Sequence, residues 1–147
     1  MGNRAVLALG DPGNPQTVGI YLHWNGGRAS VEGFLRAAKG VGIRGPAKDA
    51  TYCAARLTQL IGNYFGGTLS VGVGPLHTLD CNNGNNGVYE VLADFSIGRH
   101  IGARDKEEVD AAKTAAVAAE CEEYWMLIEQ VHGGYTYKLK KPPKGGA

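Results

Sequence analysis

One segment of the chain combines residue types that could bind a phosphate group. An alternating apolar run ends at His23, the turn Asn25-Gly26-Gly27 follows, and Arg28 comes next. Asparagine and glycine tolerate positive φ, so the backbone can turn sharply and leave its N–H groups facing outward. The start of a helix adds partial positive charge, and a guanidinium can bind a phosphate through two parallel hydrogen bonds. The spacing predicts an anion-binding corner, and an ordinary turn followed by a structural arginine is the alternative.

A second group of such residues lies along a predicted helix that Asp49 caps and Gly66-Gly67 ends. Helical spacing places an aromatic ring, a guanidinium and two amides on one face, which suits a nucleotide. A solvated helix surface is the alternative. The face consists of Tyr52, Arg56, Gln59 and Asn63, beside a buried stripe of Cys53, Leu57, Leu60, Ile61 and Tyr64.

A polar loop over 80–87 is rich in asparagine and glycine. Its composition resembles a calcium-binding loop, but the bidentate glutamate that closes such a loop is missing. The favoured interpretation is a turn whose asparagine side chains bond to their own backbone or to the base of a ligand.

The helices and strands that must position these groups are predicted in an order that indicates an α+β fold. Apolar runs at 4–9 and 18–24 indicate a β-hairpin, 68–73 a third strand, and 88–93 with 95–99 a strand pair. Ser30 is the predicted cap of a helix that ends near Lys39. We therefore expect a small antiparallel sheet, two helices after the N-terminal hairpin, and one long C-terminal helix.

The long C-terminal helix is predicted to start at an Asp105 cap, with Glu107 and Glu108 in its first turn, and to reach about Val131. Its first half is rich in alanine, which allows another backbone to approach closely, and its second half carries bulky apolar residues. This pattern predicts a contact between copies of the chain. The alternative is that the helix only covers the sheet of its own chain.

Composition limits the class of partner. The 147 residues contain 15 Lys and Arg against 14 Asp and Glu, so the chain lacks the basic excess that nucleic-acid polymers or anionic membranes select. A small anionic ligand stays compatible with this balance. We expect one domain over 1–137 and a flexible basic tail over 138–147. Three widely spaced cysteines and an apolar N-terminal run too brief for a signal peptide favour the cytoplasm.

The usual signatures of catalysis are missing from the sequence. There is no nucleophile elbow, zinc-protease motif, Walker loop or dinucleotide fingerprint. The four histidines do not have metal-ligand spacing, and Cys81 has no visible base. We expect binding without turnover, with no metal and no cofactor. Two alternatives stay open: a small hydrolase that uses His23 or Asp80, and a module that blocks a host enzyme through the aromatic end of the last helix.

Three blocks, 19–32, 55–70 and 85–91, together resemble a phage and prophage family, the first-described type of Thoeris anti-defence protein. The resemblance covers about Arg4 to Arg104. It implies a sponge that binds glycosyl-cyclic ADP-ribose isomers made by TIR-domain enzymes and holds them intact. It also implies a homo-oligomer, a hexamer, with further sites for cyclic di- or trinucleotides.

The resemblance assigns ligand contacts to Arg28, Arg56 and Asn86, and a late one to Arg104, with Arg99 as the alternative. The family places an aromatic ring before the Asn-rich loop, where this chain has only Leu76 and His77. Tyr52, Tyr64 or Trp24 could supply the ring instead. The complete set of candidate ligand-binding residues is Arg28, Arg56, Asn86, Arg104, Asn25, Gly26, Gly27, Tyr52, Gln59, His77 and His23.

Overall fold

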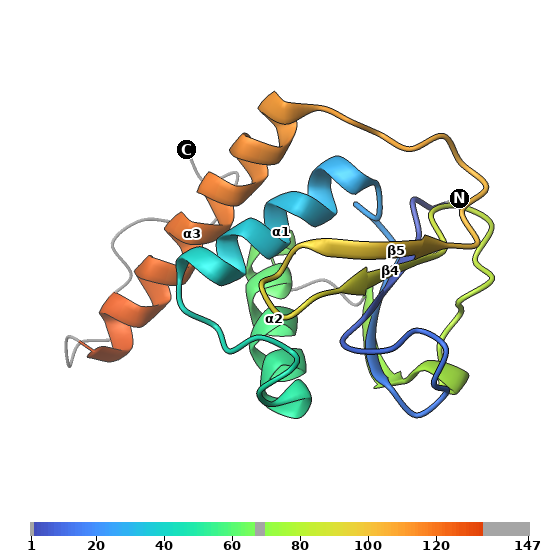
Figure 1. Ribbon diagram of the computed structural model, residues 1–147. Coiled ribbons are helices and arrows are strands. Elements are labelled where there is room, and N and C mark those ends of the chain that lie inside the picture. The colour runs from blue at the N-terminus through green and yellow to red at the C-terminus, as the bar shows by residue number, and fades with distance from the viewer. Residues whose placement is uncertain (1, 67–69, 134–147) are drawn as a thin grey trace.

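Five strands form one sheet in the computed structural model, which describes residues 2–66 and 70–133 (Figure 1). They are β1 (Ala5–Ala8), β2 (Val18–Leu22), β3 (Val71–Pro75), β4 (Val88–Val91) and β5 (Ile97–Ile101), in the order β3-β2-β1-β4-β5. With three helices on one side of this sheet, the predicted α+β class is confirmed.

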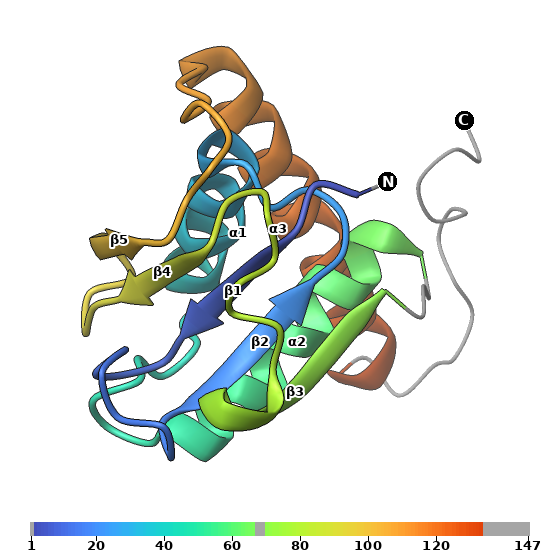
Figure 2. The ribbon, with the colours of Figure 1, turned by 90° about the vertical axis from the view of Figure 1, so that its right-hand side faces the viewer.

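The sheet is mixed, whereas the sequence predicted antiparallel pairing throughout. The hairpin β1–β2 and the pair β4–β5 are antiparallel as expected, but β1 and β4 run parallel. The reason is the long connection after β3, which passes through the short 3-10 helix η1 (Leu76–Thr78) and crosses the sheet before β4 begins (Figure 2). This connection covers the face opposite the helices, where Leu76 packs with Val6, Ala8 and Val88.

The helices α1 (Arg28–Gly40), α2 (Ala50–Phe65) and α3 (Ala111–Gly133) lie together on the other face (Figure 2). Helix α3 packs on α1 and α2, and a Cβ on Gly33 would lie 2.7 Å from the Val117 side chain. Glycine is therefore required where the two helices approach. The apolar stripes predicted for the first two helices are buried, among them Val31, Phe34, Leu35, Ala38, Cys53, Leu57, Leu60, Ile61 and Tyr64.

Of the three helix caps predicted from the sequence, one is correct. Asp49 Oδ1 accepts a hydrogen bond from Tyr52 N at 3.0 Å, and Gly66 ends α2 with φ of 79°. The predicted Ser30 cap is wrong. The extended backbone of Gly27 allows α1 to begin directly after the turn, so Ser30 is buried inside the helix and its hydroxyl bonds to Asn25.

The predicted Asp105 cap of α3 is also wrong. Helix α3 begins at Ala111, and Asp110 Oδ1 accepts from Lys113 N at 3.0 Å. The preceding residues are held elsewhere, because Arg104 N and Asp105 N both donate to Asn85 O. Residues 102–110 therefore form a strap without regular structure that crosses the start of α1.

Two predictions fall partly or wholly outside the described residues. The third strand lies at Val71–Pro75 rather than 68–73, and Thr68 is not among the described residues. The predicted tail over 138–147 also lies outside them.

On α3, Ala118, Cys121 and Tyr124 are buried, while Met126 is exposed. Exposed alanines continue along the same helix at Ala111, Ala112, Ala115, Ala116 and Ala119, and the predicted contact between copies stays a prediction.

Candidate functional site

The candidate residues fall into two groups at opposite ends of the helical layer. Arg28 begins α1, next to the end of β2, whereas Tyr52 and Arg56 lie in the first turns of α2, after the chain has run the length of α1. A helix of 13 residues spans about 20 Å. One copy of the chain therefore does not bring the two predicted groups into a single site.

The first group, which we call the Arg28 corner (Asn25 to Arg28), has the predicted backbone only in part, because of its three turn residues Asn25 alone has a positive φ and the Gly26 N–H does not face outward. Asn25 adopts φ of 59°, the left-handed conformation that asparagine tolerates. Gly26 N donates to Asn3 O at 2.8 Å, and a Cβ on Gly26 would collide with the backbone of Asn3 and Arg4. The turn is therefore packed tightly against the N-terminal segment.

The guanidinium of the Arg28 corner is already paired with carboxylates. Arg28 Nη1 lies 2.9 Å from Glu107 Oε2, and Arg28 Nε lies 3.3 Å from Glu32 Oε1. Burial opposes the charged form, but the bonds to Glu107 and Glu32 outweigh it and raise the pKa of Arg28. Glu108 lies over the same helix start, because a Cβ on Gly27 would meet its Oε1 at 2.6 Å. Side chains of the strap thus occupy the place predicted for an external anion.

Glu107 has a second partner that fixes it in this position. His100 Nδ1 lies 2.9 Å from Glu107 Oε2, and the His100 ring stacks on Tyr89 with centroids 4.1 Å apart. Hydrogen bonding to Arg28, with a further bond to His100, lowers the pKa of Glu107. The hydroxyl of buried Tyr89 donates to Gly26 O at 2.9 Å, and burial raises the pKa of Tyr89. The corner, the strap and the sheet are therefore linked by one hydrogen-bond network.

Asn86 does not face an open site. Its side chain is 3% exposed, and its Nδ2 donates to Asn3 Oδ1 at 2.6 Å and to Arg4 O at 3.0 Å. Its predicted ligand contact therefore has no support in this arrangement, because both donor hydrogens are used inside the protein. Asn83 bonds to the backbone of its own loop in the same way, donating to Asp80 O and Gly87 O. This agrees with the self-bonded turn interpretation.

The second group is the Tyr52 cluster, which consists of Arg44, Tyr52 and Arg56. The guanidinium carbons of Arg44 and Arg56 each lie 4.9 Å from the centroid of the Tyr52 ring. The tyrosine is 36% exposed, and Gln59 is exposed two turns further along α2. Within residues 2–66 and 70–133 neither guanidinium forms an ion pair with a carboxylate. Asn63 departs from the predicted face, because its Nδ2 is buried.

Arg44 is the member of this cluster that the sequence analysis missed. A signal was present: residues 36–65 contain five Lys and Arg but a single acidic residue, Asp49. Asp49 caps α2, and among the described residues it forms no ion pair with either arginine of the cluster. An excess of positive charge in one segment of a nearly neutral chain indicates a local anion-binding surface.

The remaining candidates are scattered. Arg99 pairs with Glu90 and Asp11, and Arg104 is exposed, with its backbone N–H bonded to Asn85. His77 is exposed on η1. His23 Nδ1 lies 2.9 Å from the Tyr21 hydroxyl, and the His23 ring meets Trp24 edge to face. Among the described residues none of these side chains forms a hydrogen bond or ion pair with Arg28 or with the Tyr52 cluster.

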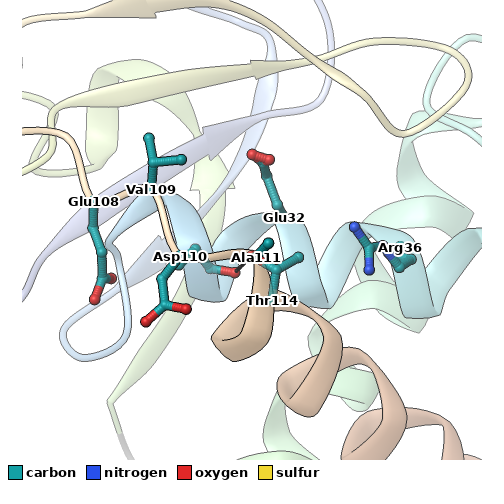
Figure 3. A pocket seen from close by; sticks show the side chains of 8 residues that line it. Glu32, Arg36, Glu108, Val109, Asp110, Ala111 and Thr114 are labelled. Carbon is teal, nitrogen blue, oxygen red and sulfur yellow. Dashed lines mark hydrogen bonds between the residues drawn. The ribbon is translucent and has the colours of Figure 1, made fainter.

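Two cavities lie outside both groups of candidates. One, of about 150 Å³, lies between α1 and the start of α3 and is lined by Glu32, Arg36, Glu108 and Asp110 (Figure 3). The other, of about 270 Å³, lies on the opposite face of the sheet beside Cys81 and Ile101. The first has mixed charge, and the second is lined mainly by apolar side chains.

The thiols of Cys53 and Cys81 have little tendency to ionise. Burial raises the pKa of Cys53 to about 11 and also raises that of Cys81. Across the part of the chain that the structure describes, no group of three or more His, Cys, Asp or Glu side chains could hold a metal ion.

None of the helices described has the length and apolar character needed to cross a membrane. Comparisons with known protein families, curated proteins and solved structures find no match to the chain.

Proposed function

We propose that this protein is a phage anti-defence sponge that binds cyclic ADP-ribose isomers, above all glycosyl-cyclic ADP-ribose, and holds them without cleavage in the cytoplasm of the infected cell. The proposal combines the resemblance to the Thoeris anti-defence family with one structural observation. That observation is the Tyr52 cluster, in which Arg56 lies on an exposed ring without a carboxylate partner among the described residues. An unpaired guanidinium is available to a phosphate group.

Gln59 supports this assignment to a nucleotide rather than to a simple inorganic anion. It is exposed on the same face of α2 as Tyr52 and Arg56. A primary amide can donate to and accept from the edge of a base, while the arginine binds the phosphate. One short helical surface thus presents groups for both parts of a nucleotide.

The properties of the candidate nucleophiles favour capture over hydrolysis. Cys53 is fully buried with its pKa raised to about 11, and the pKa of Cys81 is also raised. His23 is bonded to Tyr21, and Asp80 lies in the Asn-rich loop on the other side of the sheet from the helices. The Tyr21 hydroxyl lies beside the His23 imidazole, but burial raises the pKa of Tyr21, which opposes formation of a nucleophilic phenolate.

A homo-oligomer, with a hexamer as the expected form, would explain how the separated candidates contribute to one pocket. The Arg28 corner and the Tyr52 cluster lie at opposite ends of α1, so they can meet only if one copy presents the corner and another presents the cluster. Exposed alanines and Met126 along α3 offer a surface for such a contact. In this arrangement the further cyclic di- or trinucleotide sites would also lie between copies.

The test is a capture-and-release experiment. Purified protein is incubated with glycosyl-cyclic ADP-ribose isomers, freed of unbound ligand by desalting, heated, and analysed by mass spectrometry for the released small molecule. We expect intact ligand in stoichiometric amount. Recovery of a chemically altered molecule, or of no ligand, would overturn the proposal. Native mass spectrometry of the same sample measures the number of subunits.

A further inference from the structure

Two positive charges share one aromatic ring in the Tyr52 cluster. Because each guanidinium carbon lies 4.9 Å from the ring centroid, Arg44 and Arg56 are separated by no more than twice that distance. In exposed surroundings like charges at up to this distance repel only weakly, and the two cation–π contacts can hold both guanidiniums on the ring. Among the described residues no carboxylate forms an ion pair with either of them. The cluster is therefore a surface that presents two neighbouring positive charges to an anion.

The backbone holds Arg44 firmly in front of α2. On one side, Ile43 is buried in the core and its N–H donates to Ala38 O at 3.0 Å. On the other side, Gly45 packs so closely on the Ala93 carbonyl that a Cβ would not fit. Tyr52 is held by the Asp49 cap. The two elements that carry the cations are thus fixed before any ligand binds, which lowers the entropy cost of binding.

Two arginines outside the cluster are paired with carboxylates, whereas Arg4, Arg36 and Arg104 have no such ion pair among the described residues. Arg28 is bonded to Glu32 and Glu107, and Arg99 to Glu90 and Asp11. Carboxylates thus stabilise these arginines within the fold, whereas Arg44 and Arg56 have only the tyrosine ring. An arginine that stabilised the fold alone would gain more from a carboxylate partner than from a second guanidinium.

We propose that Arg44 is a second ligand-binding arginine, and that Arg44 and Arg56 together bind the diphosphate group of a nucleotide ligand. This inference rests on the proposed function and names the part of the ligand that this surface recognises. Each guanidinium donates to one phosphate of the diphosphate, so a ligand with a single phosphate uses only one of them. The Tyr52 ring positions both arginines and does not stack on a base.

The experiment compares matched ligands and matched variants by calorimetry. The ligands are glycosyl-cyclic ADP-ribose, ADP-ribose and AMP, of which the first two carry a diphosphate and the third a single phosphate. The variants are Arg44→Ala, Arg44→Lys, Tyr52→Phe and Tyr52→Leu. The control is Arg36→Ala, because Arg36 is an exposed arginine of α1 outside the cluster. Thermal unfolding followed by circular dichroism verifies that each variant is folded.

We expect Arg44→Ala to weaken binding of the diphosphate ligands about tenfold, or about 1.4 kcal/mol. AMP binding should change much less, and Arg36→Ala should match the wild type. Arg44→Lys should restore part of the affinity, because lysine keeps the charge but loses the planar pair of donors. Tyr52→Leu should weaken diphosphate binding as Arg44→Ala does, because the ring that positions both guanidiniums is lost, and Tyr52→Phe should lose less because it keeps the ring.

The outcomes separate the two proposals. If wild type binds the cyclic isomer and Arg44→Ala binds it equally well, the role of Arg44 is wrong and the sponge function stands. If ADP-ribose binds in an Arg44-dependent way but the cyclic isomer does not bind, the sponge function is wrong and the diphosphate site stands. If the wild type binds neither diphosphate ligand, both proposals are wrong.

Discussion

The Arg28 corner and the Tyr52 cluster use the same cationic group in opposite electrostatic settings. Arg28 is bonded to two carboxylates, and its side chain is 26% exposed. Arg44 and Arg56 lie on an exposed tyrosine without a carboxylate partner in the described ranges. The corner satisfies its charge internally, whereas the cluster leaves its charge available. A glycine turn followed by arginine therefore does not by itself identify a free anion site.

The difference arises from residues that are distant in the sequence. Glu107 reaches Arg28 from 79 positions away, through a strap that only the folded chain brings over α1. In contrast, Arg44, Tyr52 and Arg56 all lie within one short segment whose single acidic residue is a helix cap. Local composition predicts free charge only when no distant segment supplies the counter-charge.

The largest expected effect on ligand affinity comes from removing one arginine, either from the Tyr52 cluster or from the Arg28 corner. Arg56→Ala should weaken binding of glycosyl-cyclic ADP-ribose about 10- to 100-fold, because it removes an unpaired partner of the phosphate. Arg28→Ala should weaken binding of the same ligand less than tenfold, because in the wild type Glu107 already binds the Arg28 guanidinium and keeps it from the ligand. Calorimetry on both variants measures the contrast. Equal losses would show that ligand binding displaces Glu107 and that the two regions act together.

The next effect separates stability from binding. Tyr89→Phe removes the hydroxyl that bonds to Gly26 O under the Arg28 corner, which leaves a buried carbonyl unpaired. We expect unfolding by urea to show a loss of about 1–2 kcal/mol. Binding at the Tyr52 cluster should stay at the wild-type level, because Tyr89 does not contact α2. A change in ligand affinity of the folded variant would contradict the independence of the two regions.

A smaller effect should follow from freeing Arg28. Glu107→Gln removes the closest counter-charge, so binding of inorganic phosphate at the corner should strengthen by a few-fold, within about 1 kcal/mol. Titration of phosphate, followed by NMR shifts of the Gly27 and Arg28 amides, measures this change. Glu90→Gln is the matched control, since it removes one of the two carboxylate partners of Arg99 on β5 instead. If the two variants behave alike, the strap does not compete with anions at the corner.

The smallest effect is a pH dependence of the same ion pair. Bonding to Arg28 lowers the pKa of Glu107 in the folded state, so its stabilising contribution is complete above the unfolded value of about 4.3 and disappears as the pH falls through the folded value. Urea unfolding of wild type and Glu107→Gln should therefore differ at neutral pH and converge in acid. A constant difference across the acidic range would contradict the pairing with Arg28.

Most of the fold could be predicted from local patterns. Alternation located both strands of the hairpin and the β4–β5 pair, and the Asp49 and Gly66 signals bounded α2 within a residue. The start of α3 could not be predicted, because Asp105 and Asp110 are both good caps. Asn85 O accepts hydrogen bonds from the backbone N–H groups of Arg104 and Asp105, which holds that segment away from α3. Asp110 therefore becomes the cap. The parallel pairing of β1 and β4 likewise depends on the path of a long loop.

The candidate site was predicted less completely than the fold. Helical spacing correctly placed Tyr52, Arg56 and Gln59 on one exposed face, since that face depends only on α2. Arg44 was missed because it belongs to the preceding loop, and no periodic pattern relates a loop residue to a helix face. Asn86 was assigned to a ligand, but Asn3 and Arg4 bind it from the other end of the chain.

Among the described residues, hydrogen bonds to distant parts of the chain hold the strap over 102–110 at two places, Asn85 near its start and Arg28 with His100 near its middle, and a local ion pair joins Glu108 to Lys113. Its remaining residues are largely exposed and contribute little to the core. Such a segment can open locally at much lower free energy than global unfolding. Its amide hydrogens should therefore exchange with solvent well before those of β1, and breaking either attachment should accelerate that exchange while the melting temperature of the domain stays nearly constant.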